Sequence, residues 1–498
     1  MKKSVTMIFY LLVFGATTLF AQHRGDLFSF QGLGQTVDGG AQAMAMGGAW
    51  TAMSGQLDNL FHNSAGLANL KKRIVSVSGN YYKKDWWENQ VYRPDRYFVT
   101  LPFYLEGMYV PDPKNNGVLD RDLALDSSYV VHPPKDSGKR VDSKEAADWT
   151  RQKSAPVFNN IALAFPLHLF GRNVVLAAAY QQKINFLDYD RNNTYLVPMI
   201  GTSLYQGFVS RVNGNDTLNL KWFQYQRQRS GSLHSVRGAV AVKASKRLSL
   251  GLSFEYTFGT STDLLLLNKK GYFGLIDENK FFFTFDTLNH SERGTSDFTT
   301  LSAAVGLQYR FDNVTIGINV NLPRSVTRDW HYTINDQTAA LQESANVSGQ
   351  DHLDIPASYR LGLVFEPIKS FTFSLAYGYA PYSQSNVTLG QADSTFRKWP
   401  DQYVLSGGLR YRVGNFLTLM GGYRWESALF VPDGVGFTDR GPDKTSITFG
   451  SQLSFGGLGS VIFAYETKSM KYHDTYFSNT NYATEELQNF MIQYVYQF

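Results

Sequence analysis

The feature that most constrains the fold of this chain is a series of segments in which apolar residues occupy every second position. Residues 247–259 are an example, and their apolar parity carries Leu248, Leu250, Leu252, Phe254, Tyr256 and Phe258. A period of two is typical of β-strands whose two faces meet different surroundings. One such strand fits a soluble sandwich as well as it fits a membrane barrel.

The connections between these segments separate the two folds. We predict about fourteen strands, at residues 73–83, 155–168, 172–187, 230–245, 247–265, 297–311, 313–335, 352–367, 369–384, 401–413, 415–428, 443–455, 459–473 and 484–498. Tight turns, such as 170–173, alternate with longer connections, such as 187–230 and 265–297. A soluble sandwich has no reason to keep its long loops at one end, whereas outer-membrane barrels do so. The sequence therefore predicts an all-β fold, a transmembrane antiparallel barrel.

The two ends of the chain predict its compartment. Lys2 and Lys3 precede an apolar run at 5–20, and Ala21 offers a small residue for cleavage, so residues 1–21 are predicted to be a secretory signal peptide. No other stretch is long and uncharged enough for a membrane-spanning helix. The last predicted strand ends at Phe498, which resembles the C-terminal signature of bacterial outer-membrane proteins. We therefore expect the protein in the outer membrane of a Gram-negative bacterium.

Between the signal peptide and the first strand lies a segment without sustained helical or strand periodicity. Its part at 32–72 is rich in Gly, Ala and Met and carries almost no charge. A barrel of about fourteen strands is too wide for its own side chains to fill, so its lumen holds either water or a plug. We predict that residues 22–72 form a hatch inside a barrel made of residues 73–498.

The hatch also carries a family resemblance. Residues 43–52, AMAMGGAWTA, followed by 59–68, NLFHNSAGLA, are similar to the N-terminal hatch of the FadL/TodX-type outer-membrane transporters of long-chain fatty acids and aromatic hydrocarbons. Asn63, Ser64 and Ala65 stand where that family has Asn-Pro-Ala, so Ser64 departs from the pattern. The resemblance implies passive uptake of a hydrophobic molecule, captured at extracellular loops and released through hatch movement and a gap in the wall, without cofactor or energy source.

Candidate ligand-binding residues follow from strand parity and from the hatch composition. Charged residues on the polar parity are expected to face the lumen, because Arg or Lys at the midplane of the lipid face costs about 2–4 kcal/mol. Arg237, Arg360 and Arg424 lie away from the periplasmic turns, so we expect them to hold a carboxylate head. Ion pairing within the wall is the alternative role. The hatch residues Met46, Trp50 and Phe61 are expected either to line an apolar pocket or to pack the hatch.

The predicted loops contain apolar clusters that could capture a hydrophobic substrate at the cell surface. They comprise Trp86 with Trp87, residues 97–109 and residues 281–285. Packing of the loops over the barrel mouth would give the same pattern.

Other classes of protein receive little support. The chain has no cysteine, its His residues lack metal-ligand spacing, and it contains no catalytic motif, so we predict neither an enzyme nor a cofactor. A formal net charge of +5 without clustered Lys and Arg gives no basis for nucleic-acid binding. A barrel of the same family that serves protein secretion or surface attachment stays open as an alternative, since fold does not fix cargo. A general polar porin is disfavoured by the hatch.

Overall fold

The computed structural model of the chain describes residues 32–33, 39–92, 143–169, 171–200, 203–204, 218–275, 281–284, 288–338, 342–390, 399–428, 443–476 and 479–498. The predicted signal peptide at 1–21 and the predicted loop cluster at 97–109 lie outside these residues. The boundaries proposed for the signal peptide, hatch and barrel therefore stay predictions.

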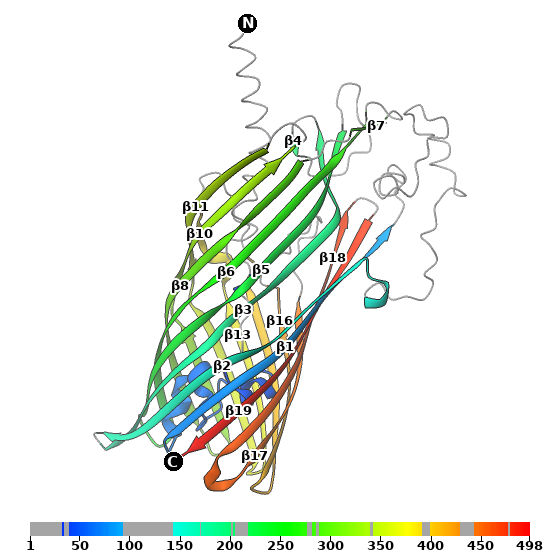
Figure 1. Ribbon diagram of the computed structural model, residues 1–498. Coiled ribbons are helices and arrows are strands. Elements are labelled where there is room, and N and C mark those ends of the chain that lie inside the picture. Colours follow the sequence, from blue (N-terminus) through cyan, green and yellow to red (C-terminus); the bar gives the residue numbers. More distant parts are fainter. Residues whose placement is uncertain are drawn as a thin grey trace.

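The described strands form one closed antiparallel barrel (Figure 1). Its wall has fourteen strands, namely β1 (Ile74–Tyr92), β2 (Trp149–Leu169), β3 (Arg172–Ile200), β5 (Leu218–Lys243), β6 (Leu248–Leu275), β8 (Leu288–Arg310), β9 (Val314–Asn321), β12 (Ser358–Ile368), β13 (Phe371–Ala380), β15 (Gln402–Val413), β16 (Leu417–Glu426), β17 (Lys444–Ser454), β18 (Ser460–Tyr476) and β19 (Asn479–Gln497). The first and last strands close the barrel, with Ile74 opposite Gln497. The predicted fold and strand number are confirmed.

The remaining elements are shorter or lie at the loop end. They are the strands β4 (Ser203–Leu204), β7 (Phe281–Thr284), β10 (Arg324–Gln337), β11 (Gln342–Ile355) and β14 (Asn386–Thr388), and the 3-10 helices η3 (Lys144–Ala146), η4 (Tyr382–Gln384) and η5 (Gly456–Leu458). No helix in the described ranges has the length and apolar character to cross a membrane.

The outer face of the barrel is apolar at one level and polar above it. On β8 the outward side chains Leu301 and Val305 are 67% and 45% exposed. Thr299 and Asp297, which continue the same outward parity toward the loop end, are polar. A lipid-facing band of apolar residues is the mark of a transmembrane barrel. The outward residues change from apolar to polar at Thr299, which marks the upper border of this band. We call the part of the wall beyond this border, which lies in water on the extracellular side, the stem.

The stem corrects the predicted loops. The sequence interpretation ended strands near 187 and 265, but β3 continues to Ile200 and β6 to Leu275. Trp86 and Trp87 likewise belong to β1 and are buried, so this pair forms no loop cluster. The strands continue because backbone hydrogen bonds between neighbouring strands extend above the lipid. There both faces of the wall can carry polar residues, so the alternation that marks a strand in the sequence is lost.

Two proline breaks divide segments that the sequence interpretation treated as single strands. The predicted strand 313–335 is interrupted at Leu322 and Pro323, which separate β9 from β10. The predicted strand 352–367 is interrupted at Pro356, which separates β11 from β12. Proline cannot donate to a ladder, so the pairing stops at both sites. Across the first break the inward side switches from odd numbers, as at Asn319, to even numbers.

The hatch occupies the lumen at the end where β1 begins and the chain ends (Figure 1). It contains α2 (Ala41–Ala45), α3 (Asn59–His62) and the 3-10 helix η1 (Ser64–Asn69). Met44, Trp50, Leu60 and Leu67 are fully buried in two apolar clusters that the hatch shares with the wall. The hatch is therefore packed as part of the barrel core.

Glycines on the inner wall allow the hatch backbone to approach this closely. A Cβ atom added to Gly251 of β6 would lie 2.3 Å from the backbone nitrogen of Ala65, and one added to Gly317 of β9 would lie 2.3 Å from the carbonyl oxygen of Thr51. Further wall glycines abut the hatch in the same way: Gly306, Gly362, Gly408, Gly422 and Gly450. We call these residues together the glycine belt. Any larger residue in the belt would push the hatch from the wall.

The glycine belt yields a first prediction. Gly251→Ala should lower the stability of the folded barrel by about 1–3 kcal/mol, because the new methyl group overlaps hatch backbone. The measurement is the temperature at which the barrel loses its folded mobility on an SDS gel, together with protease cleavage of residues 39–72. Gly238→Ala is the matched control, since a Cβ atom there meets nothing within 4 Å. Equal midpoints for the two variants would show that the belt does not hold the hatch.

The stem yields a second prediction, which concerns pH. His290 lies in the stem and is buried, with Nδ1 2.5 Å from Asp336 Oδ1 and Nε2 3.0 Å from Glu292 Oε1. Burial alone lowers the pKa of His290, but hydrogen bonds with Asp336 and Glu292 outweigh it and raise the pKa to about 9.

Because the folded pKa lies above the unfolded value of 6.5, this stabilisation is complete below pH 6.5 and disappears as the pH rises through about 9. We expect the stem of the native protein to lose about 2–3 kcal/mol between pH 7 and pH 10. Proteolysis of the stem across this range measures the loss. His290→Asn, which cannot take a charge, should flatten the profile; an unchanged profile would contradict the assignment.

Candidate functional site

The hatch motif is positioned by Asn63, which links the hatch to the wall. Its side-chain Oδ1 caps η1 by accepting from the backbone N–H of Ala65 at 3.1 Å. Its Nδ2 donates to the carbonyl oxygen of Thr51 at 2.8 Å and lies 3.2 Å from those of Leu307 and Ile318. An Asn at a helix N-cap is favoured for this geometry. One side chain thus joins two turns of the hatch to two wall strands.

Between the hatch and the stem lies a cavity of about 290 Å³. Residues toward the loop end give it an apolar side: Leu33, Ile184, Leu233, Phe298, Val326, Ile355, Tyr382 and Trp399. Phe61 and His62 of the hatch line it from the opposite side. Ligand sites are typically apolar hollows with a few placed polar groups, and this cavity has that form.

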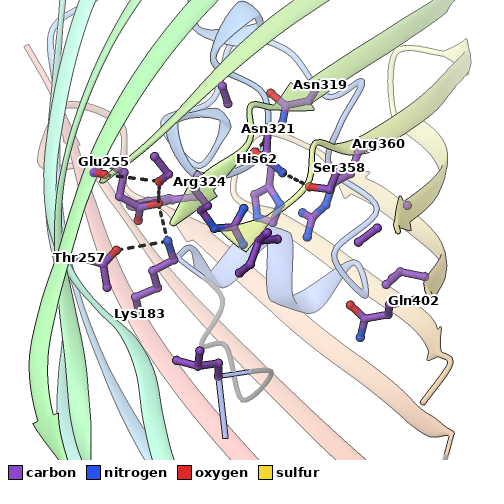
Figure 2. A pocket seen from close by; sticks show the side chains of 18 of the residues that line it. His62, Lys183, Glu255, Thr257, Asn319, Asn321, Arg324, Ser358, Arg360 and Gln402 are labelled. Carbon is purple, nitrogen blue, oxygen red and sulfur yellow. Dashed lines mark hydrogen bonds and ion pairs between the residues drawn. The ribbon is translucent and has the colours of Figure 1, made fainter. Parts of the chain in front are cut away.

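Charged side chains of the wall line the cavity between these two sides. They are Lys183, Arg237, Glu255, Arg324, Arg360, Arg424 and Glu426. Cations outnumber carboxylates in this set, so the lining favours an anion. Figure 2 shows Lys183, Glu255 and Arg324 on one side of His62 and Arg360 on the other.

The three arginines predicted from parity all line this one cavity. Arg237 donates from Nη1 to the carbonyl oxygens of Leu60 and Phe61, at 2.9 and 3.1 Å, and from Nη2 to Glu255 at 2.7 Å. It therefore holds the hatch as well as facing the cavity.

Arg424 lies between two carboxylates. Its Nε is 2.9 Å from Glu426 Oε1, and its Nη2 pairs with Glu466. Arg360, across the cavity on β12, is exposed. Arg237 and Arg424 thus have part of their charge balanced by carboxylates of the wall.

The predicted hatch residues separate into two groups. Phe61 lines the cavity. Met46 and Trp50 are fully buried in the cluster that packs the hatch against the wall, and neither lines the cavity. Packing, the second role considered for them, accounts for both.

Sequence reasoning missed Arg324, a cavity residue that lies one residue beyond Pro323. Parity counted from β9 places position 324 on the lipid side, whereas the break turns it inward. Proline within a predicted strand was the signal that could have revealed this change.

A second polar cluster lies in the stem above the cavity and is fully paired. Arg229 and Asp263 form a two-point ion pair at 2.7 and 2.9 Å, with neither side chain exposed. Tyr332 donates to Asp263 at 2.6 Å, and Arg328 pairs with Asp351 at 2.5 Å. Although burial raises the pKa of Asp263, the Arg229 charge outweighs it and holds that pKa below its usual value. The four charged side chains of this cluster that the structure describes are therefore paired with one another.

Comparison with solved structures supports the fold over almost the whole chain. The structure of a Pseudomonas aeruginosa FadL homologue matches 93% of this chain and 98% of its own, with 14% sequence identity and a TM-score of 0.57. The P. putida toluene transporter TodX matches 92% and 98%, with 14% identity and a TM-score of 0.55. The Ralstonia pickettii toluene transporter TbuX matches 92% and 98%, with 13% identity and a TM-score of 0.52.

No protein-family model and no curated protein matches the chain. The structural matches confirm the predicted resemblance to FadL/TodX-type channels at the level of the fold. An even-stranded closed barrel with an apolar outer band is the architecture of Gram-negative outer-membrane proteins, so the predicted location is also confirmed.

The geometry of the hatch motif yields a third prediction, for Ser64. Asn63 has φ −152° and ψ 101°, an extended conformation that suits the residue before a proline, and Ser64 is the first residue of η1. The Ser64 hydroxyl is buried without a hydrogen-bond partner in the described part of the chain. Ser64→Pro should therefore keep the thermal midpoint of the barrel or raise it slightly.

Asn63→Ala is the contrasting variant and should lower stability by about 1–3 kcal/mol, because buried carbonyl and N–H groups lose their partner. Both variants are compared by SDS-gel mobility after heating. If Ser64→Pro destabilised the barrel as much as Asn63→Ala, the proposed equivalence of Ser64 with the family proline would fail.

Proposed function

We propose that the protein is a passive outer-membrane channel that takes up hydrophobic molecules with an anionic head, such as long-chain fatty acids. The observation that carries this proposal is a single cavity with an apolar side and a cationic side, set between hatch and stem. Its apolar side suits a chain, and charge-assisted hydrogen bonds suit a carboxylate. The role is transport, as for the channels of similar fold, and not catalysis.

The arginines of the cavity have graded roles in this proposal. Arg360 is the most accessible of them, so it meets the head first. Arg237 and Arg424 already balance part of their charge with Glu255 and with Glu426 and Glu466. Arg237 and Arg424 provide further N–H donors, which a bound ligand carboxylate would share with the wall carboxylates that they already contact.

Release past the hatch is proposed to use a gap in the wall. The ladder between β12 and β13 ends at Tyr359 opposite Tyr379, and the next pairing along the same seam joins Asp354 of β11 to Asn386 of β14. Tyr359 and Tyr379 line the cavity beside this interruption. A hydrophobic molecule that left through this interruption would avoid the charged inner wall. The tight packing on the glycine belt restricts the hatch movement that accompanies this release.

A second candidate function is a partner role in protein secretion or surface attachment. The observation that favours it is the tall stem, whose outward residues, such as Asp297 and Thr299, offer a polar surface above the membrane. Stable co-purification with the C-terminal domain of a secreted protein, without a growth defect on fatty acids, would favour this candidate. A general polar porin would instead give steady ion conductance in planar bilayers.

The fourth prediction tests uptake. Replacing Arg237, Arg360 and Arg424 together by Ala should weaken binding of a long-chain fatty acid by at least about 10–100-fold, because the net loss of even one charge-assisted hydrogen bond costs about 1.5–3 kcal/mol. Binding of the alcohol of equal chain length should change much less. Isothermal titration on purified barrel and growth of cells on fatty acid as carbon source provide the measurements.

Arg310→Ala is the matched control, since Arg310 is an exposed residue away from the cavity, paired at 3.5 Å with Glu366. SDS-gel mobility checks that the triple variant is folded. A folded triple variant that binds and transports fatty acid as the native protein does would rule out these arginines as the head-group site.

A further inference from the structure

One wall of the cavity gathers three cations around a single carboxylate. Lys183 comes from β3, Arg237 from β5, Glu255 from β6 and Arg324 from the start of β10, and all four line the cavity. Figure 2 shows Arg324 close to Glu255 and Lys183, with Thr257 beside them. These residues are distant in sequence, and the barrel closure and the break at Pro323 bring them together.

The carboxylate of Glu255 is shared by two of the cations through one oxygen. Lys183 Nζ lies 2.5 Å and Arg237 Nη2 lies 2.7 Å from the same Glu255 Oε2. Glu255 is only 5% exposed, so these contacts are shielded from water. With one negative charge among three positive ones, the cluster keeps two positive charges in excess.

Donor groups in the cluster are left over after this pairing. The Arg237 Nε is buried and has no hydrogen-bond partner among the described residues. Arg324 makes no ion pair with any described residue, although it lines the cavity. Arg324 is half-buried, and a half-buried cation without a counter-charge favours an anionic partner, so an anionic ligand is expected to complete the site.

The size of the excess indicates the charge of that ligand. A carboxylate would neutralise one of the two positive charges, whereas a phosphate monoester carries about −1.5 to −2 charge at pH 7 and three acceptor oxygens. A guanidinium such as Arg324 matches phosphate oxygens in a two-point fork. Ile184, Leu233 and Val326 adjoin the cluster on the apolar side of the cavity and provide a surface for an attached chain.

We propose that Lys183 and Arg324 extend the head-group site around Arg237, beside Arg360 and Arg424, and that the extended site prefers an amphiphile with a dianionic head, a phosphate monoester on an apolar chain. The inference rests on the proposed uptake function and makes its ligand class more specific. Arg424 is less suited to the head, since it already contacts two carboxylates.

The experiment compares dodecyl phosphate, dodecanoate and inorganic phosphate by isothermal titration on the full-length barrel in detergent at pH 7. We expect dodecyl phosphate to bind about tenfold more tightly than dodecanoate, because it engages an additional cation. At pH 5, where the phosphate carries about a single charge, dodecyl phosphate should bind less tightly than at pH 7. Inorganic phosphate, which lacks the chain, should bind weakly.

Arg324→Gln tests the assignment directly and should reduce the preference for dodecyl phosphate to about twofold or less, with little effect on dodecanoate. It removes no ion pair among described residues, so it should fold; SDS-gel mobility checks this. Arg310→Gln, outside the cavity, should keep the native preference.

Equal binding of dodecyl phosphate and dodecanoate, or an unchanged preference in Arg324→Gln, would overturn this inference and leave the uptake proposal standing. Inorganic phosphate binding as tightly as dodecyl phosphate would assign the cluster to free phosphate instead. If neither amphiphile bound, the proposed function itself would fail.

Discussion

The structure depends on filling a lumen that its own wall cannot fill. Fourteen strands enclose more space than inward side chains occupy, so the interior requires either water or additional chain. Here residues 39–72 supply that chain, and the glycine belt lets their backbone lie within van der Waals distance of the strands. The small residues of the wall and the uncharged Gly/Ala/Met composition of the hatch both follow from the need to pack the hatch closely against the wall. The cavity exists where this filling stops, above Phe61 and His62.

The strand number could be predicted from sequence because it rests on local signals, namely the period of two and the tight turns. The strand lengths could not be predicted, because apolar residues face outward where the wall meets lipid and inward where it meets water. On β9 the apolar Ile316 and Ile318 face outward, whereas on β10 the apolar Trp330 and Tyr332 face inward. The period of two continues across Pro323, but the apolar positions face outward before it and inward after it. Periodicity alone therefore cannot reveal where the membrane ends.

The same reversal limited what could be predicted of the cavity. Arg237, Arg360 and Arg424 lie on strands whose parity is continuous with the lipid-facing band, and they do meet in one cavity. Arg324 follows a break and was missed. The sequence could not decide whether Met46 and Trp50 line the pocket or pack the hatch, because the hatch has no periodicity that indicates which way a side chain points. Its side chains are oriented by the wall around it, and that arrangement is not local in sequence.

Charge, more than fold, bears on the cargo. Two of the solved structures of similar fold are named as toluene transporters, and toluene is a neutral molecule. The fold alone therefore does not fix the charge of the cargo. In this chain the cavity wall carries Lys183, Arg237 and Arg324 around one Glu255. A neutral hydrocarbon could fill the apolar side but would leave the excess positive charge of this cluster without a counter-charge. The proposed preference for an anionic head rests on the cost of that excess charge and does not depend on how the hatch or the wall releases the ligand.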